Sequence, residues 1–197
     1  MDYLRDPKAI YARSFAIIRQ EADFSGLPTD SEAVVTRIIH ACGMPEIAGD
    51  LRISEDFCKA AATAMQSGRP ILVDAEMVRQ GIIGKSLNVI CTLNDASANG
   101  TTRSAAAVEL WRPHLDGALV AIGNAPTALF ALLEMIDAGA PRPAAIVGFP
   151  VGFVGAAESK EELHRNPRGI PYATLLGRRG GSAMAAAVIN ALTQGEV

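Results

Sequence analysis

The stretch from Ala118 to Gly139 reads ALVAIGNAPTALFALLEMIDAG and joins two kinds of local structure. Its first six residues are almost continuously apolar, as in a strand that is buried on both faces of a sheet. A turn containing Gly123 and Asn124 follows, and apolar side chains then recur at helical spacing. A strand that runs directly into a helix is half of a βαβ unit, so this stretch predicts a parallel sheet with helices packed against it.

The same alternation recurs along most of the chain from residue 51 onward. Neither a low-complexity linker nor an internal repeat interrupts it. We therefore predict an α/β fold with one domain over residues 1–197, a largely parallel sheet and helices on both of its faces. The predicted strands are ILVDA (71–75), NVICTL (88–93), ALVAIG (118–123), AAIVGF (144–149) and YATLLG (172–177), and the helical windows are 56–68, 101–115, 125–139, 155–166 and 181–194.

An N-terminal pair of helices is predicted before this region. The first covers KAIYARSFAIIRQEAD (8–23), where apolar residues have helical spacing, and Pro7 suits its first position. The second carries His40 and ends at Gly43, a residue type that commonly stops a helix. The candidate N-caps are Asp6 for the first helix and Asp30 or Ser31 for the second.

Composition and charge exclude several classes of protein. The net charge is −3 and no basic block is present, so nucleic acid is not an expected partner. No run of about 18 apolar residues predicts a membrane span, and the N-terminus lacks a secretory apolar region. We therefore expect a cytoplasmic protein without a membrane partner. Cys42, Cys58 and Cys91 are odd in number and widely spaced, which predicts reduced thiols and no zinc site.

Familiar catalytic motifs are missing. GRRGGSA (177–183) has the spacing of neither a dinucleotide-binding loop nor a P-loop, which leaves a general anion site or a structural turn. The GxSxG motif of serine hydrolases is absent. The three histidines lack metal-ligand spacing. We expect His114 and His164 to have surface roles.

His40 is the exception. The last turn of its helix favours a protonated imidazole, whereas Arg37, three residues earlier, disfavours it. Such opposing influences can hold a histidine pKa near neutrality, as acid–base catalysis requires. The residues alone leave two interpretations open, a functional His40 and a hydrogen-bonded core histidine.

Six segments, taken together and in order, resemble the precorrin-8X methylmutase (precorrin isomerase) family of cobalamin biosynthesis. They run from residue 10 to residue 192, so the resemblance covers almost the whole chain. The segments are IYARSFAIIRQEAD, VVTRIIHACGMPE, VDAEMVRQGI, AIGNAPTALFALLE, GFPVGFVGAAESKEEL and PYATLLGRRGGSAMAAAVINAL.

The resemblance implies an isomerase that needs no cofactor and no metal. Members of this family move a methyl group from C-11 to C-12 of precorrin-8X, a tetrapyrrole, and so form the corrin hydrogenobyrinate. It implies that His40, in RIIHACGM, is the acid–base residue, and that Arg37 and Ser14 contact the substrate. It also implies a homodimer.

The substrate has an apolar ring with peripheral carboxylates, so its site needs an apolar wall and anion-binding groups at the rim. The loop GFPVGFVGA could supply the wall. Two alternatives stay open, the cobalt-precorrin-8 methylmutase of the anaerobic route and a corrin carrier without catalysis. The candidates for the rim, besides Arg37, are Arg13, Lys85, Arg103, Gly123 and Asn124.

Overall fold

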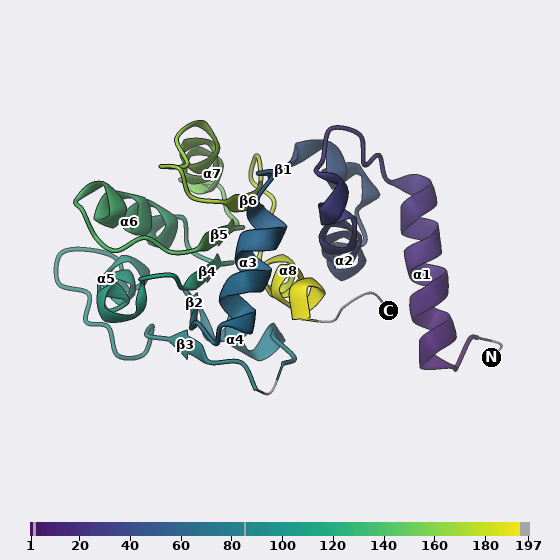
Figure 1. Cartoon of the computed structure of the whole chain (residues 1–197), viewed down its shortest axis with the longest axis horizontal. Coiled ribbons are helices and arrows are strands. Elements are labelled where there is room, and N and C mark those ends of the chain that lie inside the picture. The colour runs from purple at the N-terminus through teal and green to yellow at the C-terminus, as the bar shows by residue number, and fades with distance from the viewer. Residues whose placement is uncertain (2, 85, 194–197) are drawn as a thin grey trace.

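The protein is described by a computed structural model that covers residues 1, 3–84 and 86–193 (Figure 1). The helices are α1 (Pro7–Glu21), α2 (Glu32–Cys42), α3 (Phe57–Gln66), α4 (Glu76–Gly81), α5 (Arg103–Glu109), α6 (Pro126–Asp137), α7 (Ala156–Arg165) and α8 (Ser182–Thr193). Three 3-10 helices are η1 (Thr29–Ser31), η2 (Pro45–Asp50) and η3 (Arg112–His114). The strands are β1 (Leu51–Ile53), β2 (Ile71–Val73), β3 (Val89–Cys91), β4 (Leu119–Ile122), β5 (Ala145–Gly148) and β6 (Tyr172–Leu175).

The strands form one six-stranded sheet in the order β1-β6-β5-β4-β2-β3. Every neighbouring pair is parallel except β1 and β6, which are antiparallel. All five predicted strands are confirmed, and the predicted α/β fold with a largely parallel sheet is confirmed with them. The added strand β1 was not predicted, because three residues, with Arg52 in the middle, are too short to show a period.

Helices cover both faces of the sheet, as predicted. One core places α2, α3 and α8 against alternate strand residues such as Val73, Ala121 and Val147. The other core places α5, α6 and α7 against the residues between them, such as Val120 and Ile146. Side chains of a strand point alternately to its two faces, so a continuous apolar run feeds both cores.

The predicted N-terminal helical pair is confirmed, and its two boundaries have local causes. The Asp6 carboxylate accepts a hydrogen bond from the Ala9 N–H at 3.1 Å, and Pro7 begins α1. Gly43 ends α2 with a φ of 70°, a left-handed conformation that glycine adopts without steric strain. The predicted side-chain cap of α2 is wrong: Ser31 occupies the cap position, but its hydroxyl donates to the Pro28 carbonyl instead.

Helix α1 stands at the far side of α2 from the sheet, as Figure 1 shows. In the described part of the chain it packs mainly on α2 and leaves apolar side chains exposed, among them Ile10, Tyr11 and Ile17, each 42% exposed. No helix among the described residues is long and apolar enough to cross a membrane.

Candidate active site

His40 lies between α1 and α2, where Ser14 reaches it across the helix pair. The Ser14 hydroxyl forms a hydrogen bond of 2.9 Å with His40 Nδ1. The rings of Tyr11 and Phe15 each lie 5.4 Å from the imidazole, centroid to centroid, and Phe15 meets it edge to face at 83°. Residues 11, 14 and 15 share one helix face because they are three and four positions apart. The first helix therefore presents a hydroxyl and two aromatic rings to one histidine.

Arg37 completes this cluster from the same helix as His40. Its guanidinium lies 5.7 Å from the centre of the Phe15 ring, so the cation stacks on the aromatic side chain that also contacts the imidazole. Partial withdrawal from solvent between the two helices lowers the pKa of His40, and the Arg37 charge lowers it further. The imidazole is therefore held in its neutral form more readily than a free histidine.

A cavity of about 220 Å³ opens beside His40. Ligand pockets for small molecules usually measure about 300–1,000 Å³, so this cavity can take one edge of a macrocycle and not the whole ring. Its wall is lined by Ser14, Ile17, Ile18, Glu21, Ile39, His40, Gly43 and Pro45.

A second cluster lies at the carboxyl ends of the parallel strands, the edge where ligands usually bind in such sheets. Asp74 directly follows β2 and is buried. Its carboxylate accepts hydrogen bonds from the backbone N–H groups of Gly123, Asn124 and Ala125, at 2.8, 3.0 and 2.8 Å. The N–H groups of Gly123 and Asn124, which we expected to bind a substrate carboxylate, thus already bind the carboxylate of Asp74. The side chain of Asn124 is exposed.

The loop between β6 and α8 connects this edge to the segment that follows the His40 helix. The Arg179 guanidinium forms an ion pair of 3.0 Å with Glu46 on η2. Lys160 on α7 is fully buried and donates a hydrogen bond from Nζ to the Arg179 carbonyl. Burial lowers the pKa of Lys160 to about 8. Arg179 therefore joins a strand-end loop to η2, the segment that follows the His40 helix.

The remaining candidates are not gathered at His40. Arg13 is exposed on α1 next to Ser14. Arg103 is exposed at the first turn of α5, which Figure 1 places toward the opposite end of the molecule from α1. Lys85 lies outside the described residues. The structure thus brings together Ser14, Arg37 and His40.

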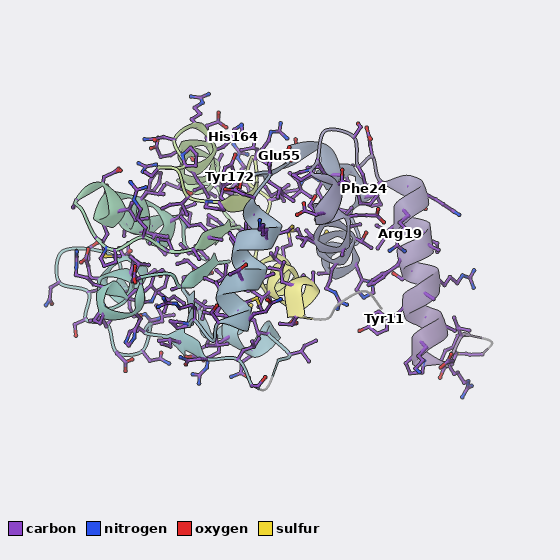
Figure 2. All side chains as sticks on the ribbon, viewed as in Figure 1. Tyr11, Arg19, Phe24, Glu55, His164 and Tyr172 are labelled. Atoms are coloured by element: carbon purple, nitrogen blue, oxygen red, sulfur yellow. The ribbon has the colours of Figure 1, made fainter. Side chains whose placement is uncertain are left out.

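The other histidines and the cysteines lie elsewhere. His114 is exposed on η3, as expected. His164 is half-buried and pairs through Nδ1 with the Tyr172 hydroxyl at 2.7 Å, so the purely solvated role that we expected is wrong. Figure 2 shows His164 and Tyr172 together, far from Tyr11 on α1. The three cysteines are free, and no group of potential ligands among the described residues could hold a metal ion.

Three features of the site were not predicted from the sequence. The pairing of Tyr11 and Phe15 with His40 could have been sought in the spacing of the two rings around Ser14. The role of Asp74 had a signal too, since a carboxylate directly after a buried strand demands hydrogen-bond donors. The Arg179–Glu46 pair had none, because 133 positions separate the two residues.

Comparison with known proteins gives consistent results. The family model described as precorrin-8X methylmutase matches residues 9–194. The precorrin-8X methylmutase of Pseudomonas aeruginosa is 56% identical, over 98% of this chain and 97% of that protein. The cobalt-precorrin-8 methylmutase of Methanothermobacter thermautotrophicus is 38% identical, over 93% and 90%. A solved structure of the precorrin-8x methyl mutase from Thermus thermophilus superposes with a TM-score of 0.84 at 38% identity, covering 94% of each chain.

Proposed function

Because this chain belongs to the precorrin-8X methylmutase family, we propose that it converts precorrin-8X to hydrogenobyrinate in cobalamin biosynthesis. The enzyme is an isomerase: the bond between the methyl group and C-11 breaks, the bond to C-12 forms, and the composition of the molecule is unchanged. The observation that carries the proposal is the Ser14–His40 hydrogen bond at the wall of a cavity, next to Arg37.

His40 is the acid–base residue of this proposal. With its pKa lowered, the imidazole is neutral, and the Ser14 hydroxyl can donate to Nδ1. That bond fixes the tautomer with its proton on Nε2, the nitrogen left for the substrate. The Nε2–H group can then donate a hydrogen bond to the conjugated ring as the methyl group migrates, so that the ring is polarised while the imidazole stays neutral. Acid–base catalysis of this kind contributes about 10²–10⁴-fold to a rate.

Substrate orientation supplies a further part of the acceleration. Arg37 is suited to a peripheral carboxylate near His40, because a guanidinium can bind both carboxylate oxygens at once. Arg13, on the exposed side of α1, the Asn124 side chain and Arg103 are further candidates for carboxylates. The exposed positions of all three are compatible with that role.

Relatives named for the metal-free substrate support precorrin-8X over its cobalt-containing counterpart. Two relatives named precorrin-8X methylmutase are 56% and 53% identical to this chain. Five named cobalt-precorrin-8 methylmutase are 33% to 38% identical. Turnover of metal-free and of cobalt-loaded substrate by the purified protein, compared at equal concentration, tests this choice.

A cytoplasmic homodimer is the form in which we propose that the enzyme works. The support for a dimer is the exposed apolar side of α1, a helix that packs mainly on α2 within its own chain. Light scattering after size-exclusion chromatography tests it, with an Ile10→Glu variant to weaken the contact. A monomeric wild-type protein that turns over substrate would contradict the dimer and leave the activity standing.

The experiment that tests the function uses paired absorption spectra. Wild-type protein and His40→Ala each receive precorrin-8X and are followed for bound pigment and for conversion to hydrogenobyrinate. We expect the variant to retain pigment and lose turnover. A wild-type protein that binds pigment and never changes its spectrum would instead support a corrin carrier.

A further inference from the structure

Three apolar side chains are exposed on the loop between β5 and α7. Phe153 is 83% exposed and Val154 is 88% exposed, and Val151 next to them is 43% exposed. Folded proteins rarely expose contiguous apolar side chains unless a ligand or a partner covers them. Arg178, from the neighbouring β6–α8 loop, lies with its guanidinium 5.4 Å from the centre of the Phe153 ring. We call these four residues the crest.

Backbone hydrogen bonds hold the crest in place. The Val151 N–H donates to the Asn124 carbonyl at 3.3 Å, and the Gly152 N–H donates to the Arg178 carbonyl at 3.2 Å. The Gly181 N–H donates to the Phe149 carbonyl at 2.8 Å. Three loops from three strand ends therefore form one bonded unit, and the apolar side chains project from it.

Gly180 shows how closely two of these loops approach. A Cβ atom at this position would overlap the carbonyl oxygens of Phe149 and Pro150. Only glycine lets the β6–α8 loop lie against the end of β5, and this contact sets the position of Arg178 beside Phe153. The crest residues are thus exposed on loops whose backbone is held in place by hydrogen bonds and close packing.

Charge points to the kind of ligand that the crest takes. Arg178 is exposed, and no carboxylate among the described residues forms an ion pair with it. Its neighbour Arg179 is already paired with Glu46. An apolar surface next to an available guanidinium matches a ligand that combines an apolar face with a carboxylate.

We propose that the crest is a second contact surface for the corrin ligand. Phe153 and Val154 pack against the ring, and Arg178 binds one of its peripheral carboxylates. This inference rests on the proposed function, because it takes the tetrapyrrole as the ligand. Two features favour it over a second copy of the chain. The crest is at the carboxyl edge of the parallel strands, and the loop that carries Arg178 is joined by the Arg179–Glu46 ion pair to η2, which follows the His40 helix.

The test is equilibrium binding of hydrogenobyrinate, the unreactive product, followed by absorption. Phe153→Ser and Arg178→Gln are each expected to bind it about tenfold more weakly, the size of a lost aromatic contact or charge-assisted hydrogen bond. The control variants are Leu110→Ser, which removes an exposed apolar side chain directly after α5, and Arg165→Gln, which removes an exposed arginine of α7. Both controls should stay within about twofold of wild type.

A modified ligand separates the contribution of Arg178 from that of Phe153. With the carboxylates of hydrogenobyrinate converted to methyl esters, Arg178→Gln should bind as well as wild type, whereas Phe153→Ser should still bind more weakly. Unchanged affinity for hydrogenobyrinate in both crest variants overturns the inference while wild-type turnover upholds the function. A Phe153→Ser protein that changes from dimer to monomer and keeps its affinity assigns the crest to a second copy instead. Failure of the wild-type protein to bind any corrin refutes the proposed function itself.

Discussion

Two histidines in this protein bond a hydroxyl group through Nδ1, in very different surroundings. His40 meets Ser14 between α1 and α2 at 2.9 Å, beside a cavity. His164 meets Tyr172 at 2.7 Å, at the first residue of β6 and thus at the amino end of a parallel strand. The two bonds are alike in geometry, but the first lies between two helices away from the sheet and the second joins a helix to the amino end of a strand.

The difference lies in what surrounds the rest of each imidazole. The first ring has Tyr11, Phe15 and a cationic Arg37 around it, and partial burial together with Arg37 lowers its pKa. The second ring bridges helix α7 to the sheet, and desolvation raises the pKa of its Tyr172 partner. A histidine–hydroxyl bond therefore indicates catalysis only when the other ring nitrogen faces a place where substrate can bind.

Replacing each histidine with alanine should distinguish the two histidine–hydroxyl pairs most strongly. His40→Ala is expected to lower kcat by about 10²–10⁴-fold, because it removes the acid–base group. His164→Ala should keep kcat within about twofold of wild type. Initial rates at saturating precorrin-8X measure both. An equal fall in the two variants would contradict the assignment of roles.

Removal of the Ser14 hydroxyl should have the next largest effect. In Ser14→Ala nothing favours the tautomer with its proton on Nε2, and a neutral hydrogen bond is lost, so we expect kcat to fall about tenfold. Rates at saturating substrate, with bound pigment measured separately, give the result. A variant with full kcat would show that Ser14 does not orient the imidazole.

The matched hydroxyl removal at the second pair should affect stability and spare activity. Tyr172→Phe leaves a half-buried His164 without its partner, and we expect the free energy of unfolding to fall by about 1 kcal/mol. Urea denaturation measures the loss, and turnover assays on the same preparation should match wild type. A loss of turnover with unchanged stability would mean that the second pair is catalytic after all.

The smallest expected effect is a shift in the titration of His40. Arg37 lowers the pKa of this imidazole, so Arg37→Gln should raise it. Because the neutral ring accepts from Ser14, the acidic limb of the kcat–pH profile should then move to higher pH. Proton NMR of the imidazole ring in substrate-free protein measures the shift independently of any loss of substrate contact. A pKa that does not move would show that burial alone sets it.

Most of the sheet could be predicted because β2, β4, β5 and β6 are buried on both faces. Continuous apolar runs such as ALVAIG at 118–123 have few structural alternatives in a soluble chain. The antiparallel strand β1 could not be predicted, because its pairing of Leu51 with Leu175, 124 positions apart, is set by tertiary contact and not by a local pattern. Helix α4 was not predicted either, because its six residues are too few to show a helical period.

The site was predictable in its residue types and much less in its contacts. The isolated His40 after Arg37 has a local signal, and resemblance to a known family pointed to Ser14. Which nitrogen of His40 bonds Ser14, and how the rings of Tyr11 and Phe15 enclose the imidazole, depend on how α1 crosses α2. Lys160 shows the limit most clearly, since a lysine in the charged sequence ESKEEL reads as a surface residue, yet it is fully buried.

The absence of a side chain at Gly180 bears on how this enzyme can be varied. A methyl group there would separate the β6–α8 loop from β5 and strain the hydrogen bonds that join this loop to the β5–α7 loop, which is itself bonded to the β4–α6 turn. The three loops therefore form one structural unit. Chimeras between relatives should exchange residues 123–125, 149–155 and 176–181 together, because a transplanted loop meets neighbours shaped for a different one.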